Sequence, residues 1–92
     1  MIERIQTMAQ TIITLYTRKR CSLCEKAKQT ILELKEDWNF TLDEIDIDES
    51  DELTETYGIM IPVVLIDGEE VGFGIINKID ISKRLQEKLK NF

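Results

Sequence analysis

The residues best suited to chemistry in this chain are Cys21 and Cys24, its only cysteines, in the stretch R-K-R-C-S-L-C-E. Two thiols at this C-x-x-C spacing can close and open a disulfide, one attacking a substrate and the other resolving the mixed disulfide. A predicted strand precedes the pair and a predicted helix follows it. Cys21 should therefore lie beside unpaired N–H groups at the positive end of the helix dipole, where the pKa of a thiol falls from about 8.5 to roughly 3.5–7.5. We predict that Cys21 is the nucleophile and that Cys24, which faces inward, is the resolving thiol.

Three consecutive cations, Arg18, Lys19 and Arg20, come directly before Cys21, although the formal net charge of the chain is -6. Their local field opposes the global charge, so it can hold an anion, either the Cys21 thiolate or an anionic thiol substrate. The alternative interpretation is an exposed loop in which cations gather by chance.

Three other roles for the cysteine pair are open. A structural disulfide across so short a loop stabilises a fold by only about 2 kcal/mol on the loop-entropy formula. Zinc prefers four ligands, and a chain without histidine would need carboxylates or a second chain to complete the site. Unpaired core cysteines are the third role, which the neighbouring cations and the helix start disfavour. We predict a redox pair and no metal site.

Length and composition indicate one domain over residues 1–92, with residues 1–10 as an N-terminal extension. The net negative charge repels phosphates, so no nucleic-acid partner is expected. The longest apolar run, residues 59–66, is far shorter than the roughly 20 residues that span a bilayer, so no membrane association is expected. No secretory signal is visible and cysteines are few, which favours the cytoplasm.

The first half of the chain predicts a strand, a helix and a second strand. Residues 11–16 are β-branched and aromatic with apolar residues on both faces, as is typical of a central strand. A helix then runs to about Asp37. Residues 41–47 alternate and indicate a second strand, parallel to the first because a helix intervenes. The helix places four apolar residues on one face, namely Ala27, Ile31, Leu34 and Trp38.

Residues 48–58 predict a short helix. They begin with cap-type residues, carry acids in the first turn and end at Gly58, where a left-handed cap is expected. Eight of the 18 acids fall between Asp43 and Glu55. We interpret this run as a solvated face that favours the helix N-terminus and assign it no function.

The remainder predicts a hairpin and a closing helix. Strands at 63–66 and 69–73 flank Asp67-Gly68, a two-residue turn signal. The fold class is therefore α/β, with a four-stranded mixed sheet of order β-α-β-α-β-β-α flanked by helices. The closing helix is capped by Asn77 or Asp80, and its apolar face comprises Ile81, Leu85, Leu89 and Phe92.

The single proline, Pro62, interrupts the apolar run I-M-I-P-V-V-L-I. A proline inside a central strand would remove a ladder hydrogen bond, so Pro62 is expected at the first position of the third strand. If that strand lies beside the first, the turn before Pro62 shares a sheet end with Cys21. The backbone at this turn can pair with a bound peptide or thiol.

The pattern T-L-Y-T-R-K-R-C-S-L-C, followed by D-I-D-E-S-D-E-L-T-E-T-Y-G-I-M-I-P-V-V-L-I-D-G, resembles the glutaredoxin family within the thioredoxin-like fold. The resemblance covers about residues 11–90. It implies a cis peptide bond before Pro62, a nucleophile at Cys21 and a resolving thiol at Cys24. It also implies that the basic residue at position 18 contacts a glutathione carboxylate.

The same resemblance implies that the backbone of Ile61 pairs with the glutathione cysteine. It also identifies Arg18 as the basic residue that contacts the glutathione carboxylate. The chain departs from the family at three places. Ser22 and Leu23 replace the usual Pro-Tyr between the cysteines, and a Met-Ile-Pro segment replaces Thr-Val-Pro. The aspartate that anchors the glutathione amino end is absent, and Asn77 near that place is better explained as a helix cap.

We predict a thiol-disulfide oxidoreductase that reduces protein disulfides or glutathione-mixed disulfides. It is expected to be a monomer with no tightly bound cofactor, and glutathione is a candidate electron donor. Two alternatives come from other classes. One is an iron-sulfur cluster carrier that uses Cys21, which Ser22 in place of proline makes conceivable. The other is a non-catalytic thioredoxin-like interaction module.

Overall fold

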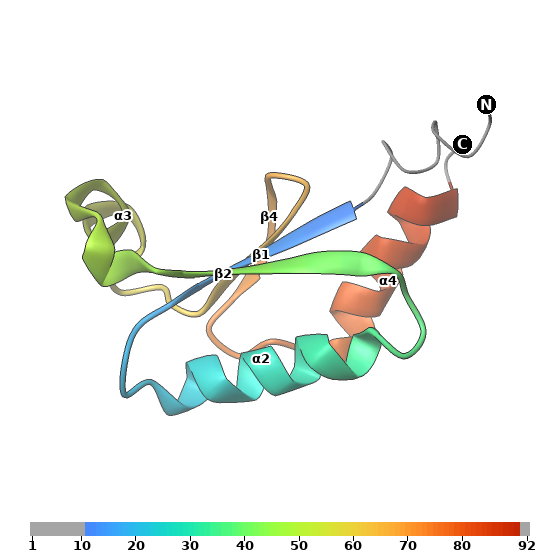
Figure 1. Ribbon diagram of the computed structural model, residues 1–92, viewed down its shortest axis with the longest axis horizontal. Coiled ribbons are helices and arrows are strands. Elements are labelled where there is room, and N and C mark those ends of the chain that lie inside the picture. The colour runs from blue at the N-terminus through green and yellow to red at the C-terminus, as the bar shows by residue number, and fades with distance from the viewer. Residues whose placement is uncertain (1–10, 91–92) are drawn as a thin grey trace.

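The computed structural model of the protein describes residues 11–90 (Figure 1). The N-terminal extension, residues 1–10, and Phe92 lie outside the described residues, as does the side chain of Leu89. No helix between residues 11 and 90 is both long and apolar enough to cross a membrane. Along the chain the elements are β1 (Thr11–Thr17), α2 (Ser22–Leu34), β2 (Phe40–Asp46), the 3-10 helix η1 (Ile47–Glu49), α3 (Asp51–Tyr57), β3 (Val63–Ile66), β4 (Glu69–Phe73) and α4 (Lys78–Lys90).

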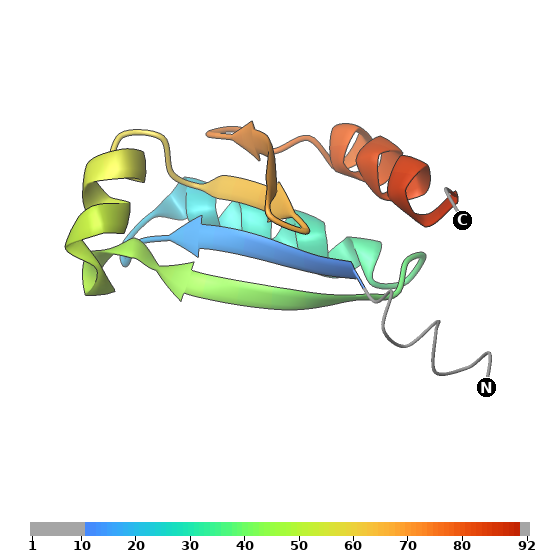
Figure 2. The ribbon, with the colours of Figure 1, turned by 90° about the horizontal axis from the view of Figure 1, so that it is seen from above.

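The four strands form one mixed sheet in the order β2-β1-β3-β4 (Figure 2). Strand β1 lies parallel to β2, because α2 connects them, and antiparallel to β3. Helices α2 and α4 lie on one face of the sheet, whereas α3 stands at one end of the opposite face (Figure 1). The predicted α/β class, with a four-stranded mixed sheet flanked by helices, is confirmed.

The core lies between the sheet and the helices α2 and α4. In β1, Ile13 and Leu15 point to this side and are fully buried. The predicted apolar face of α2 packs against them, and Trp38 is partly buried beside it. This packing fixes the first turn of α2, which carries the cysteines, relative to the end of β1. The core cluster comprises Ile13, Leu15, Ala27, Ile31, Leu34, Phe40, Val64, Ile66, Ile81 and Leu85.

Helix α2 ends at Leu34 and not near Asp37. The N–H groups of the next three residues donate to carbonyl oxygens three positions back, at 3.1 to 3.3 Å, so the helix tightens into a turn. The N–H of Trp38 then donates to the Leu34 carbonyl at 2.9 Å. This turn starts strand β2 at Phe40, one residue before the predicted start.

Two turns contain glycine for different reasons. Asp67 and Gly68 both have positive φ, 51° and 85°, as the predicted two-residue hairpin turn requires. The prediction of a left-handed cap at Gly58 is wrong, because its φ is -54°. A Cβ atom at Gly58 would lie 2.5 Å from the Thr54 carbonyl oxygen, so the position needs glycine for close approach of backbone atoms.

Asn77 is the residue that caps α4. Its Oδ1 accepts hydrogen bonds from the N–H groups of Ile79 and Asp80, at 2.8 and 3.3 Å. Its carbonyl oxygen accepts the first helical bond, from Ile81 at 3.1 Å. Of the two predicted caps, the structure therefore selects Asn77.

Candidate functional site

Cys21 and Cys24 are joined by a disulfide at the start of α2. Cys21 is the N-cap residue with extended backbone angles, and its Sγ accepts a hydrogen bond from the Cys24 N–H at 3.1 Å. The two Cα atoms are 5.2 Å apart. Cys24 is only 2% exposed, whereas Cys21 is partly exposed. An external thiol therefore reaches the disulfide at the sulfur of Cys21.

The three cations before Cys21 have different surroundings. Lys19 and Arg20 are exposed, and Arg20 has a φ of 59° where the chain turns from β1 into α2. Arg18 is turned toward η1, where its Nε donates to both carboxylate oxygens of Asp48, at 3.0 and 3.1 Å. Its Nη1 also donates to the Gly58 carbonyl oxygen at 3.5 Å. Arg18 thus already pairs with a carboxylate of the chain itself.

Pro62 lies at the same sheet end as the cysteines. The peptide bond between Ile61 and Pro62 is cis, and Pro62 is buried. The next residue, Val63, is paired with Tyr16 near the C-terminal end of β1. The Pro62 carbonyl accepts a hydrogen bond from Gly74 at 2.8 Å. Within residues 11–90, the N–H and C=O of Ile61 take part in no hydrogen bond, so both groups can pair with another chain.

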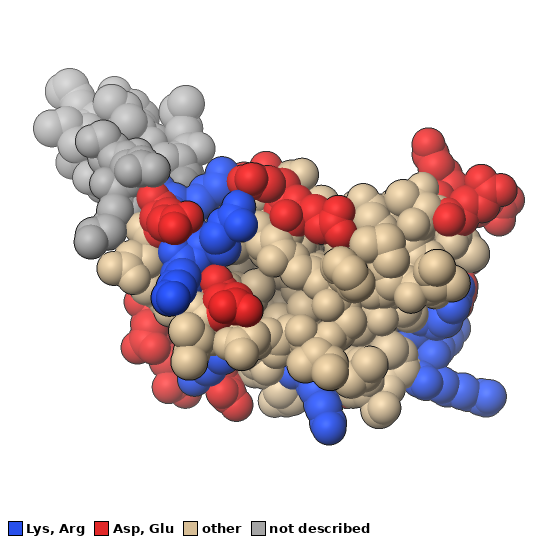
Figure 3. All heavy atoms as spheres, turned by 180° about the vertical axis from the view of Figure 1, so that it is seen from behind, with Lys and Arg blue, Asp and Glu red and all other residues tan. Residues whose placement is uncertain are grey.

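Exposed apolar side chains surround this end of the sheet, and we call them the apolar rim. Leu23 lies between the cysteines and is 42% exposed, and Ile59 just before the cis bond is fully exposed. Phe73 is paired with Val63, and Ile75 follows the glycine that bonds Pro62. In Figure 3, uncharged surface at this end separates the acids of α3 from the Lys and Arg side chains on the opposite side. The apolar rim comprises Leu23, Ile59, Phe73 and Ile75.

A cleft of about 400 Å³ adjoins Cys24 on the side of β2. It lies between the loop that carries Arg18 and Lys19 and the end of β2. Its volume falls within the roughly 300–1,000 Å³ of small-ligand sites, although it is open to solvent. Charged side chains dominate the lining of this cleft, so its electrostatics bear on which molecules approach the cysteines.

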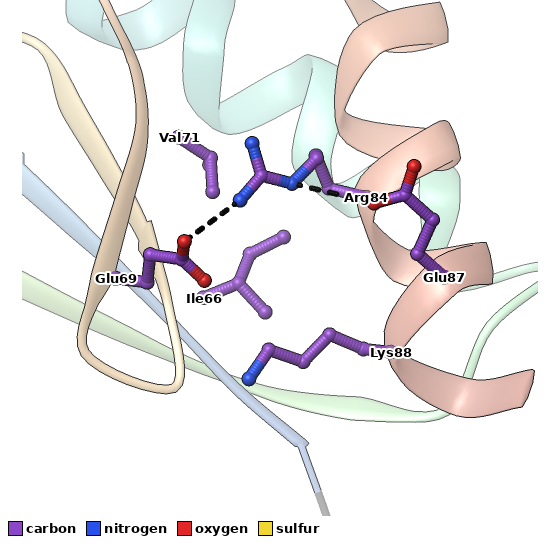
Figure 4. A pocket seen from close by; sticks show the side chains of 6 residues that line it. All are labelled: Ile66, Glu69, Val71, Arg84, Glu87 and Lys88. Carbon is purple, nitrogen blue, oxygen red and sulfur yellow. Dashed lines mark ion pairs between the residues drawn. The ribbon is translucent and has the colours of Figure 1, made fainter. Parts of the chain in front are cut away.

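A larger hollow of about 480 Å³ lies away from the cysteines, between α4 and the β3-β4 hairpin (Figure 4). Its charged groups neutralise one another: Arg84 pairs with Glu69 at 3.1 Å and with Glu87 at 3.8 Å. Lys88 pairs with Asp67 at 3.6 Å. Neither cysteine is among the residues that line this hollow.

Tyr16 and Tyr57 join α3 to the sheet. Their rings stack with centroids 4.9 Å apart. Burial raises the pKa of the Tyr16 hydroxyl above its ordinary value of 10.0, and the neighbouring Tyr57 and Asp43 raise it further. Tyr16 is therefore uncharged at neutral pH and contributes packing to this end of the sheet.

Asp48 belongs to the site although no sequence pattern indicates it, and it lies within the acidic run between Asp43 and Glu55. The spacing of 30 residues between Arg18 and Asp48 carries no local signal. Only the parallel pairing of β1 with β2 places the residues that follow the two strands side by side. Among residues 11–90, no three His, Cys, Asp or Glu side chains are grouped so that they could hold a metal ion.

Known proteins resemble the chain over most of its length. The family described as glutaredoxin-like domain (DUF836) matches residues 12–91. A solved protein of Nitrosomonas europaea is 26% identical, with a TM-score of 0.70 and coverage of 83% of this chain and 92% of its own. A protein of X. campestris is 24% identical, with a TM-score of 0.69 and coverage of 82% and 96%. A mutant thioredoxin of Halobacterium salinarum is 18% identical, with a TM-score of 0.67 and coverage of 95% and 81%, so the fold is thioredoxin-like.

Proposed function

The chain belongs to the glutaredoxin-like domain family, and we propose that it is a thiol-disulfide oxidoreductase. The position of the cysteine pair carries the proposal. Cys21 caps α2, and its sulfur accepts a hydrogen bond from the Cys24 N–H. In the reduced protein the same N–H and the helix dipole favour the Cys21 thiolate over the thiol. Cys21 is then the nucleophile, and the buried Cys24 is the resolving thiol.

The catalytic cycle transfers two electrons to a substrate disulfide. The Cys21 thiolate attacks one substrate sulfur, which forms a mixed disulfide and releases the other sulfur as a thiolate that takes a proton from water. Cys24 loses its proton to water and attacks the Cys21 sulfur, which frees the second substrate thiol and closes the Cys21–Cys24 disulfide. Two molecules of an external thiol then restore the dithiol and leave as a small disulfide. Both cysteines lie in one chain, so we propose a monomer that needs no tightly bound cofactor.

The surface around the cysteines supports a polypeptide as the substrate. The apolar rim supplies exposed apolar area next to Cys21 for an unfolded or extended segment. The free N–H and C=O of Ile61, before Pro62, can form strand-like hydrogen bonds with that segment. Protein disulfides and proteins carrying a glutathione-mixed disulfide both present such a segment.

We expect the variant Cys24→Ser to accumulate a covalent complex with a disulfide-containing polypeptide, because attack by Cys21 proceeds and resolution does not. Insulin is a suitable substrate, and mass spectrometry under non-reducing conditions measures the complex. Dithiothreitol should release it. Ser22→Ala, which alters an exposed neighbour, is the control and should resolve its mixed disulfide, so that no complex accumulates. Failure of Cys24→Ser to form the complex, with intact fold, would contradict the proposed roles.

A further inference from the structure

The ion pair between Arg18 and Asp48 joins the loop that precedes Cys21 to the 3-10 helix η1. Both carboxylate oxygens of Asp48 accept from the Arg18 Nε, and the Gly58 carbonyl accepts from its Nη1. The side chains are 34% and 48% exposed, so dissolved molecules reach the pair. Three cations precede Cys21 and can attract an anion toward it. Asp48 neutralises the first of them, Arg18.

The cleft beside Cys24 has an excess of negative charge. Its lining holds two cations, Arg18 and Lys19, and four carboxylates. Because Arg18 is paired with Asp48, which lies outside the lining, the pair contributes little positive field to the cleft. An anion that approaches the cysteines from this side is repelled by carboxylates from α2, β2 and η1. These carboxylates belong to Glu25, Glu44, Asp46 and Glu49. Glu44 is paired with Lys28 at 3.1 Å, so within residues 11–90 three unpaired carboxylates of the lining oppose the one unpaired cation, Lys19.

We propose that the Arg18–Asp48 ion pair makes the site select against anionic thiols, so that its preferred substrates are polypeptide disulfides with neutral or cationic flanking groups. This inference rests on the proposed exchange chemistry at Cys21. A thiol with net negative charge, such as glutathione, that approaches along this cleft must displace Asp48 from Arg18 or move against the unpaired carboxylates. A neutral or cationic thiol requires neither. The acidic run that includes Asp48 therefore determines specificity.

The test measures how fast three small thiols reduce the Cys21–Cys24 disulfide. Glutathione is anionic, 2-mercaptoethanol is neutral and cysteamine is cationic. The thiolate attacks the Cys21 sulfur and Cys24 leaves as a thiolate that gains a proton. A second thiol molecule then attacks the mixed disulfide, which releases Cys21 and forms the small disulfide. Each rate is divided by the rate of the same thiol with an uncharged small disulfide, which removes differences in intrinsic reactivity.

Asp48→Asn keeps the shape of the side chain and leaves Arg18 without its anionic partner. We expect the corrected rate with glutathione to rise about threefold relative to 2-mercaptoethanol, and the rate with cysteamine to fall by a similar factor. Both changes should shrink at about 0.5 M salt. Arg18→Gln should shift the ratios in the opposite direction, which keeps the test decisive if Asp48→Asn is unstable.

Glu33→Gln is the matched control, because it removes one negative charge from another exposed ion pair, with Lys78 at 3.2 Å, toward the other end of α2. Its ratios should equal those of the wild type. The inference would be overturned if the ratios stay unchanged in Asp48→Asn and Arg18→Gln, or if Glu33→Gln shifts them equally. The proposed function would still stand in that case, provided that the wild type reduces insulin. A wild-type disulfide that none of the three thiols opens would overturn the proposed function and the inference together.

Discussion

Replacing Cys21 with serine should reduce the turnover of insulin disulfides, with dithiothreitol as the reductant, to the rate of dithiothreitol alone. Of the two sulfurs at the start of α2, that of Cys21 is partly exposed. A serine hydroxyl in its place is not ionised at neutral pH and forms no disulfide. Cys24 cannot substitute, because it is 2% exposed. The loss should therefore be complete.

Two measurements separate this loss of chemistry from a loss of structure. The far-ultraviolet circular dichroism of Cys21→Ser should match that of the reduced wild type, since serine is itself a preferred N-cap residue. Ser22→Ala changes the adjacent exposed residue and should retain most of the activity. Residual turnover by Cys21→Ser above the rate of dithiothreitol alone would exclude Cys21 as the nucleophile.

Replacing Leu34 with alanine should lower the free energy of unfolding by about 2–4 kcal/mol, since it leaves a cavity in a close-packed core. Leu34 is 1% exposed and packs at the end of α2 against the sheet. A loss of this size is a large share of the roughly 5–15 kcal/mol that stabilises a typical domain. Urea denaturation of the disulfide-bonded protein measures it.

Leu32→Ala is the matched control, because it makes the same chemical change on the same helix at a side chain that is 37% exposed. It should cost roughly 0.5 kcal/mol or less, as is usual for surface substitutions. Equal losses in the free energy of unfolding for the two variants would mean that the face of α2 with Leu34 does not pack against the sheet. The m-value should remain the same in both variants if unfolding stays two-state.

The sequence predicted most of the fold because the decisive signals are local. Apolar residues at helical spacing identified the buried face of α2, and Asp67-Gly68 identified the hairpin turn. The cysteine pair was placed correctly at the start of a helix for the same reason. In each case the pattern lies within a few residues, where the periodicities of helices and strands determine which side chains share a face.

The features that the sequence did not predict depend on contacts between distant segments. Asp48 bonds Arg18 across 30 residues, and neither residue differs locally from other surface charges. A glycine at the end of a predicted helix indicates a left-handed cap, whereas at Gly58 the close approach of the Thr54 carbonyl explains the glycine. Helix α2 ends at Leu34 because the next N–H groups donate to carbonyl oxygens three positions back. The spacing of apolar residues does not predict these hydrogen bonds. Such details follow from packing, so local propensity does not determine them.

Alkylation of the reduced protein shows whether Cys21 is the reactive thiolate of a redox-active pair. Iodoacetamide labelling is followed as a function of pH, and mass spectrometry locates the label. We predict that Cys21 is labelled before the buried Cys24, with a half-maximal rate at a pH below the ~8.5 of a free cysteine. Labelling of Cys24 first, or a half-maximal rate for Cys21 at or above pH ~8.5, would mean that Cys21 is not the reactive thiolate.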